Sequence, residues 1–236
     1  NILCIWESIY NFDLLVEENK TYNTKSEYFL GVSLISSYLL GFWGENAYYH
    51  GLVSKDIYGS KIVKELKSVN VKIKYIEYDK VEDTSLTLSI TKDNLEEVID
   101  KKITKELKYK EYKFIPDIIF SDGTSPKTVY KVFNKFKEAI KILYVNSDNS
   151  DLLKVCKTSK CIIFTIDVAE KITGVKFDSN NKDTLEQIYS KLKDVYGKII
   201  IIDLEASGTV FETSEKIKQQ LESKKSEILF PKIIKW

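Results

Sequence analysis

The chain has 236 residues, and its 36 Lys and Arg residues nearly cancel its 35 Asp and Glu residues, which leaves a formal net charge of +1. This balance gives no electrostatic reason to bind nucleic acid, and no apolar run approaches the roughly 20 residues of a membrane-spanning helix, so neither nucleic acid nor membrane insertion is expected. The three cysteines, Cys4, Cys156 and Cys161, follow no disulfide or metal-binding spacing, so we expect no metal site and an intracellular location, in the cytoplasm or an organelle matrix.

The first half of the chain alternates short apolar segments with amphipathic ones. Residues 1–6 are predicted to form a buried strand, and residues 9–30 a mixture of strand and loop. A buried helix is predicted over 33–42, and residues 47–53 return to strand. Asp56 precedes an amphipathic helix and is its predicted N-cap, because a carboxylate there accepts hydrogen bonds from the unpaired N–H groups of the first turn.

Residues 71–78 and 84–90 are predicted strands that pair in a small sheet of their own. In the second strand, three apolar residues alternate strictly with Ser and Thr, which is typical of a half-exposed strand. We expect the apolar face to be covered by another chain or by the highly charged segment 92–113, which fits either helix or loop. The apolar residues are Leu86, Leu88 and Ile90.

From Pro116 onward the pattern is regular. Apolar strands that alternate with helices predict a parallel sheet with helices on both faces, so the predicted fold class is α/β. Gly197 is predicted to end the last helix as a C-cap. The predicted strands are 117–120, 142–145, 161–165 and 198–203, and the predicted helices are 125–139, 150–156 and 184–195.

The early segment IWESIYNF resembles the opening of the PfkB, or ribokinase-like, carbohydrate kinases. That family has a strand ending in Gly-Glu, followed five residues after the glycine by an aspartate that holds sugar hydroxyls. Here Trp6 stands at the glycine and Glu7 is kept. Asn11 stands at the aspartate, where it can still hydrogen-bond a hydroxyl group but without a charge to strengthen the bond.

Two further segments continue the resemblance. LGVSLI resembles the family's Gly-Gly-x-x-x-Asn helix start, with Gly31 kept and Ile35 at the asparagine, and glycines there let the backbone approach the substrate. In the family's V-G-x-D-x-x-G motif, Ser54 replaces the first glycine, while Asp56 and Gly59 match.

The second half of the chain also resembles the family, but other residue types stand at several positions of the family's motifs. FTIDVAEKITG resembles the family's N-x-x-E motif, which organises magnesium and phosphate, and Val168 stands at the glutamate and Thr165 at the asparagine. IIIIDLEASGTVF resembles the nucleotide loop, where Gly208 is kept but Asp203 and Glu205 replace a threonine and a glycine. Two acids beside an ATP phosphate tail would repel it. SDGTSPKTVYKVF and YVNSDNSDLLK resemble the pseudouridine-kinase branch.

These segments together imply an α/β, ribokinase-like three-layer sandwich with a mostly parallel central sheet and a small β lid. The resemblance covers nearly the whole chain, so residues 1–236 are expected to form a single domain, with lid strands within about 9–30 and 71–90. The chain shown ends before the family's Gly-Ala-Gly-Asp segment, so the catalytic C-terminal segment is expected to be missing and no catalytic residue is assigned. The resemblance assigns substrate binding to Asn11, Gly31 and Asp56, and cofactor binding to Asp203 and Gly208.

Three hypotheses stay open. In the first, the lost polar groups make the chain a pseudokinase without a cofactor, which serves as a structural or regulatory subunit bound to a protein partner or in a homodimer through the lid sheet. In the second, it is an active sugar or nucleoside kinase, similar to the pseudouridine kinases, that uses ATP and Mg²⁺ and whose catalytic C-terminus lies outside the chain shown. In the third, it is an α/β binding domain unrelated to the kinases.

Overall fold

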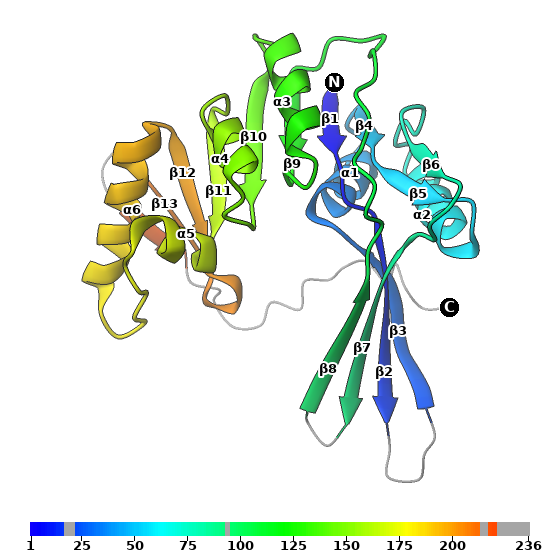
Figure 1. The fold of residues 1–236 in the computed structure, drawn as a ribbon, viewed down its shortest axis with the longest axis horizontal. Helices are drawn as coiled ribbons and strands as arrows, with labels where there is room; N and C mark the ends of the chain where they lie inside the picture. The colour runs from blue at the N-terminus through cyan, green and yellow to red at the C-terminus, as the bar shows by residue number, and fades with distance from the viewer. Residues whose placement is uncertain (17–21, 93–94, 213–216, 221–236) are drawn as a thin grey trace. The chain divides into compact units, whose positions relative to one another are not determined.

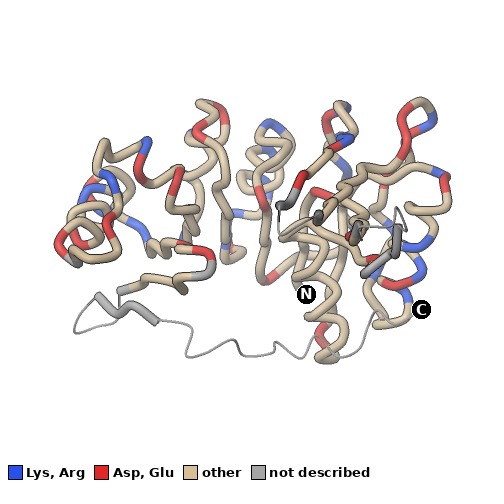
Figure 2. Tube along the Cα trace, turned by 90° about the horizontal axis from the view of Figure 1, so that it is seen from below, with Lys and Arg blue, Asp and Glu red and all other residues tan. Residues whose placement is uncertain are grey.

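The computed structural model of the chain describes residues 1–16, 22–92, 95–212 and 217–220 (Figure 1). These residues belong to two compact units: the N-terminal unit lies within Asn1–Ile115, and the C-terminal unit begins at Pro116. Charges of both signs are spread along the trace, as the balanced composition leads one to expect (Figure 2). None of the described helices is long and apolar enough to cross a membrane.

The core of the N-terminal unit consists of β1 (Ile2–Ile5), α1 (Val32–Phe42), β4 (Ala47–His50), β5 (Leu52–Ser54), α2 (Ile57–Ser68) and β6 (Glu77–Asp79). β1 and β4 pair in parallel, and so do β5 and β6. The side chains of Leu3, Cys4 and Ile5 are fully buried, and α1 packs against both β1 and β4. The burial of successive residues fits the continuous apolar sequence of β1.

The remaining strands of this unit form a separate sheet, the lid sheet: β2 (Ile9–Val16), β3 (Tyr22–Leu30), β7 (Ser85–Lys92) and β8 (Leu95–Lys101). The strand order is β3-β2-β7-β8, in which β2 and β7 run parallel and the outer strands are antiparallel to their neighbours. The lid sheet stands apart from β1 and β4 (Figure 1). The small β lid expected from the sequence is therefore confirmed.

The predicted pairing of residues 71–78 with 84–90 is wrong. β7 lies between β2 and β8, while β6 pairs with β5 and Lys72 forms a parallel bridge to β4. The physical reason is burial: Tyr75 is buried, so its segment completes the core of the unit instead of the lid. Residues 92–113, which fitted helix or loop equally well, supply β8 and then an extended segment without regular structure.

The C-terminal unit has the strands β9 (Ile118–Ser121), β10 (Ile140–Val145), β11 (Cys161–Thr165), β12 (Ile199–Asp203), β13 (Thr209–Glu212) and β14 (Ile217–Gln220). Its helices are α3 (Pro126–Lys135), α4 (Ser150–Cys156), α5 (Ile166–Thr173) and α6 (Lys182–Tyr196), and a 3-10 turn follows β12. β9 to β12 are parallel neighbours, and β13 and β14 extend the sheet antiparallel. The predicted α/β class with a mainly parallel sheet is confirmed.

Along these strands, buried side chains alternate with more exposed ones. Leu143, Ile162 and Ile200 are fully buried, whereas Ile142, Ile163 and Ile201, which are next to them along the same strands, are half-buried. The helix ends follow the predicted chemistry, since Gly197 ends α6 with a left-handed φ of 59°, a conformation that glycine adopts without steric cost.

Candidate functional site

β1 ends in a turn, the β1 turn (Trp6–Ser8), that leads into the lid sheet. Its backbone φ is 86° at Trp6 and 22° at Glu7. Residues other than glycine rarely adopt a positive φ. The position that the resemblance assigns to a glycine thus has a glycine-type conformation but carries a buried indole. Among the described residues, no hydrogen-bond partner is present for the indole Nε1 of Trp6. Backbone strain and an unpaired buried N–H group each cost stability, on the order of 1–3 kcal/mol.

Tyr49, at the end of β4, holds the β1 turn in place. Its hydroxyl lies 3.0 Å from the carbonyl oxygen of Trp6, 2.9 Å from that of Glu7 and 2.7 Å from the hydroxyl of Ser8. The Tyr49 side chain is fully buried. Burial raises the pKa of the Glu7 carboxyl, and Lys102, at 3.7 Å, only partly opposes this effect. The contacts of Tyr49 therefore hold the turn in its strained backbone conformation.

Gly31 lies at the start of α1, directly against this turn. Its φ is 108°, and a Cβ atom placed there would lie 2.3 Å from the carbonyl oxygen of Glu7. In the structure, Gly31 lets the start of α1 lie close to the backbone of the β1 turn. Its predicted contact with a substrate stays a prediction.

Asn11 lies on β2 beside a carboxylate that the sequence analysis did not single out. Asn11 is 1% exposed, and its Nδ2 donates to Oδ1 of Asp13 at 2.8 Å. Asp13 also accepts from the hydroxyls of Ser26, at 2.5 Å, and Tyr28, at 3.3 Å. The Oδ1 of Asn11 has no hydrogen-bond partner among the described residues. The two-residue spacing of Asn11 and Asp13, which puts both on one face of a strand, was the signal that could have found Asp13.

The face of the lid sheet that carries Asn11 is largely polar, and its β7 residues are buried. Asn11 and Asp13 pair in register with Thr87 and Ser89 of β7, so these side chains share that face. Thr87 and Ser89 are buried, and the hydroxyl of Thr87 donates to Asp100 of β8 at 2.6 Å. On the opposite face Leu86, Leu88 and Ile90 are half-buried. The better covered face of β7 is thus its polar one, which strand alternation alone did not reveal.

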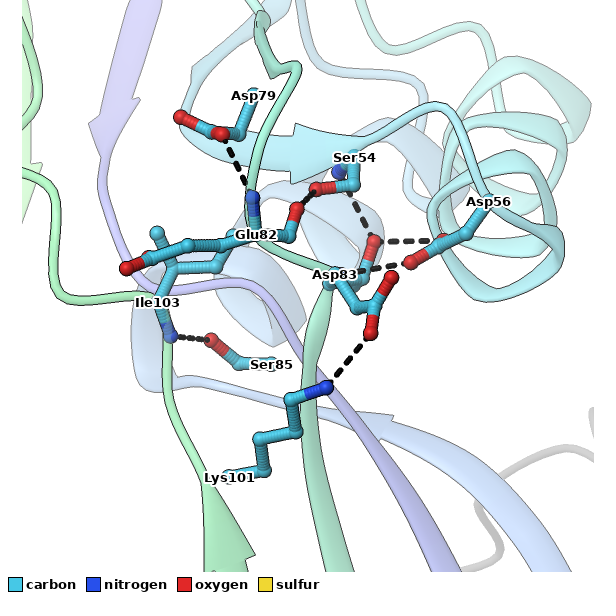
Figure 3. A network of polar contacts seen from close by, with 9 residues as sticks. Ser54, Asp56, Asp79, Glu82, Asp83, Ser85, Lys101 and Ile103 are labelled. Atoms are coloured by element: carbon cyan, nitrogen blue, oxygen red, sulfur yellow. Dashed lines mark hydrogen bonds and ion pairs between the residues drawn. The ribbon is translucent and has the colours of Figure 1, made fainter.

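Asp56 connects α2 to the start of β7, as Figure 3 shows. It is the N-cap of α2, as predicted, with its Oδ1 accepting from the backbone N–H of Gly59 at 2.7 Å. The backbone N–H and the hydroxyl of Thr84 donate to the same carboxylate at 2.7 and 2.8 Å. Burial raises the pKa of Asp56, but the hydrogen bonds from Gly59 and Thr84 outweigh it and hold the pKa below its usual value. The ionised carboxylate of Asp56 thus links the start of α2 to Thr84. Its predicted contact with a substrate stays a prediction.

Other side chains hold the base of the lid sheet to the core (Figure 3). Asp79 accepts from the backbone N–H groups of Val81 and Glu82 at 2.6 and 2.9 Å and from Lys105 at 2.5 Å. The hydrogen bond from Lys105 is the main reason why the pKa of Asp79 lies well below its usual range. On β8, Lys101 pairs with Asp83 at 2.6 Å. Hydrogen bonds and ion pairs of the segments beside β7 and β8 thus surround the base of the lid sheet.

In the C-terminal unit, Asp203 and Gly208 bound one tight turn after β12, the β12 turn (Asp203–Gly208). The Oδ1 of Asp203 accepts from the backbone N–H of Glu205 at 2.9 Å, and its Oδ2 accepts from the hydroxyl of Tyr144 at 3.1 Å. Burial, reinforced by Asp203, raises the pKa of Tyr144. The φ angles of Glu205 and Gly208 are 56° and 96°. The structure thus brings the two predicted cofactor-binding residues together, with Asp203 already engaged by protein groups.

Thr165 and Val168 lie where β11 passes into α5. Thr165 is directly opposite Asp203 in the β11–β12 register. Val168 is 2% exposed, so its side chain belongs to the hydrophobic core. Asp122, at the end of β9, is a buried carboxylate whose Oδ1 accepts from the backbone N–H and the hydroxyl of Thr124 at 3.2 and 2.9 Å. No group of three or more His, Cys, Asp or Glu side chains within the described residues could hold a metal ion.

A family model described as pfkB family carbohydrate kinase matches residues 1–232 of the chain. Among solved structures, fructokinase from Halothermothrix orenii is 14% identical with a TM-score of 0.72, over 93% of this chain and 84% of that chain. Ribokinase from Arabidopsis thaliana, complexed with ribose and ATP, is 16% identical with a TM-score of 0.72, over 93% and 77%. The nucleoside kinase from Methanocaldococcus jannaschii is 16% identical with a TM-score of 0.64, over 92% and 75%. At these identities the likeness shows the fold alone, and no curated protein matches the chain.

Proposed function

Because the chain belongs to the pfkB family of carbohydrate kinases, we propose that it is a pseudokinase of that family, which has kept the fold and serves as a structural or regulatory subunit of a protein assembly. Phosphoryl transfer depends almost entirely on positioning and on charge stabilisation. Loss of the groups that supply both would leave the fold without its chemistry.

The observation that carries the proposal is the burial of Val168. The resemblance places there the glutamate that organises magnesium, and the structure has an apolar side chain packed in the core. A valine has no oxygen with which to bind a metal ion or its water, and hard cations require oxygen ligands. The residues present therefore do not fit magnesium at this position.

The β12 turn supports the same conclusion for the nucleotide. Asp203 stands where the resemblance places a threonine, and its carboxylate is hydrogen-bonded to Tyr144 and to the backbone of Glu205. Two carboxylates in this turn would repel a phosphate chain instead of donating to it. The residues of the turn do not fit an ATP phosphate tail.

A second candidate function, an active sugar or nucleoside kinase of the pseudouridine-kinase type, is favoured by the lid sheet. Asn11 carries a buried oxygen without a partner among the described residues, and Asp13 places a carboxylate beside it. Buried acceptors of this kind suit ligands that bring several hydroxyl donors, as sugars and nucleosides do.

A phosphotransfer assay separates the two functions. The full-length gene product is incubated with ATP, magnesium and a panel of sugars and nucleosides that includes ribose, fructose and pseudouridine, and ADP release is measured. We expect no ADP above the background of a sample without protein, because Val168 and Asp203 replace the groups that position magnesium and phosphate. Turnover with any sugar or nucleoside would establish the second function and refute the first.

The lid sheet is also where we propose that the assembly forms, as a homodimer. In the single chain, three apolar residues of β7 are half-buried: Leu86, Leu88 and Ile90. Ile99 of β8, which pairs with Leu88, is 50% exposed. Tyr58 of α2 packs on the rings of Tyr10 and Phe12, with ring centroids 5.3 Å apart in each pair. An apolar sheet face next to an exposed edge strand is a surface that a second copy can cover.

Sedimentation analysis tests the homodimer. We expect the wild-type protein to sediment as a dimer and Ile99→Lys to sediment as a monomer, because a lysine on the apolar face would be desolvated on association. Val81→Lys is the matched control, since Val81 is 93% exposed and lies outside the lid strands. A monomeric wild type, or a dimer that survives Ile99→Lys, would refute this interface.

A further inference from the structure

A groove of about 540 Å³ runs between α3 and α4 on the surface of the C-terminal unit. Its lining includes two lysines from α3, Lys127 and Lys131, and two from the end of α4, Lys154 and Lys157. The groove shares no residue with the β12 turn or with α5, so it is distinct from the positions at which the resemblance places the nucleotide.

Positive charge is concentrated in this groove. Lys127 and Lys131 are four residues apart on one helix and therefore project from the same side of it. One carboxylate, Asp151, also lines the groove, and it is paired with Lys154 at 2.7 Å. Four lysines against one acid form a marked local excess in a chain whose total net charge is +1. Pro126, the first residue of α3, also lines the groove, so the positive end of that helix dipole lies beside the lysines.

The groove also presents an aromatic surface. Tyr130 lies between the two α3 lysines in sequence, and its side chain is 46% exposed. A tyrosine ring can stack on a nucleobase, and lysine ammonium groups bind phosphates as point charges. The volume falls in the range of small-ligand pockets, roughly 300–1,000 Å³, which favours a small molecule over a protein partner that would need a much broader surface.

We propose that the α3–α4 groove is a binding site for a nucleotide-type oligophosphate, with the phosphate chain between the lysines and the base against Tyr130. The site requires no magnesium and no phosphoryl transfer, so it is independent of the kinase chemistry and extends the pseudokinase proposal to a regulatory ligand. Binding would place a charged ligand across two helices that pack against each other.

Calorimetry with sodium tripolyphosphate, ATP and adenosine, all without magnesium, tests the proposal on the full-length protein. We expect tripolyphosphate to bind and to lose affinity as salt is raised. ATP should bind more tightly than tripolyphosphate, and adenosine more weakly than either. The double variant Lys131→Glu/Lys157→Glu should weaken ATP and tripolyphosphate by about tenfold or more. Tyr130→Ala should weaken ATP by about fivefold or more and leave tripolyphosphate unchanged.

The matched control is Lys55→Glu/Lys74→Glu, which reverses two exposed lysines of the N-terminal unit. It changes the net charge by the same amount and should leave both affinities within about twofold of wild type, since charges beyond a Debye length are screened. Three results would overturn the site: no binding of tripolyphosphate, equal losses in the two double variants, or stronger binding of a polyglutamate peptide than of tripolyphosphate. The last would identify the groove as a docking surface for an acidic protein.

Discussion

Titration of ATP into the Lys131→Glu/Lys157→Glu variant is expected to give no binding that depends on magnesium. The variant is chosen because it weakens the basic groove, which requires no magnesium, so a heat that depends on magnesium would come from the region that the kinases use. In that region the chain has a buried valine at position 168 and a carboxylate at Asp203. The expected result follows from the pseudokinase proposal, in which these residues replace two groups that would contact magnesium and phosphate.

The size of the effect can be estimated from hydrogen bonds to charged groups. Each is worth about 1.5–3 kcal/mol, so the two losses amount to about 3–6 kcal/mol. At about 1.4 kcal/mol per tenfold change in affinity, this is about two to four orders of magnitude. Repulsion from Asp203 and Glu205 acts in the same direction. A micromolar dissociation constant would thereby rise to about 0.1–10 mM.

Two comparisons make this titration decisive. Tripolyphosphate binding by the wild-type protein serves as a positive control for a competent sample. A repeat in the absence of magnesium shows whether any heat depends on the metal. Micromolar, magnesium-dependent binding by the groove variant would mean that the family's nucleotide site works despite Val168, and the pseudokinase proposal would then fail.

Replacement of Gly31 by alanine is expected to destabilise the N-terminal unit strongly. The new Cβ would lie 2.3 Å from the carbonyl oxygen of Glu7, and the φ of 108° is one that alanine rarely adopts. The β1 turn cannot easily move away, because Tyr49 holds its carbonyl oxygens. We expect a loss of about 3 kcal/mol or more in the free energy of unfolding, measured by chemical denaturation.

Gly44→Ala is the matched control for this substitution. Gly44 also has a positive φ, of 85°, but a Cβ atom there would meet nothing within 4 Å. Its expected cost is therefore the conformational term alone, about 1–2 kcal/mol. Equal losses for the two variants would mean that the close approach of Gly31 to the β1 turn adds nothing to stability.

The elements that the sequence predicted well are those whose signal is local. The helix that Asp56 caps and the parallel strands from Ile118 onward follow from apolar periodicity and from capping residues. Strand pairing failed because partners lie far apart in sequence, and β7 found β2 instead of residues 71–78. Alternation along a single strand predicts two faces, but it does not tell which face is the better covered.

The candidate site was predictable only in part for the same reason. Motif spacing located Asn11 and the β12 turn. It also aligned the glycine of the family motif with Trp6, whose φ is positive in the structure. The hydrogen bond of Asn11 to Asp13 and the pairing of Asp203 with Tyr144 depend on side chains that the fold brings together. The basic groove joins lysines from two helices, and the even spread of lysines in the sequence hid it.

The parallel seam between β2 and β7 affects how the chain reaches its native state. Each outer pair of the lid sheet is a local hairpin, but the seam joins Tyr10 to Leu86 across the whole core of the N-terminal unit. Contacts of such high sequence separation form slowly, because loop-closure entropy is lost before they contribute stability. During synthesis on the ribosome, the first hairpin therefore emerges with one edge of β2 unpaired. Until β7 arrives, that edge, with its aromatic Tyr10 and Phe12, is open to pairing with nascent neighbours, and a chaperone that shields it would raise the yield of folded protein.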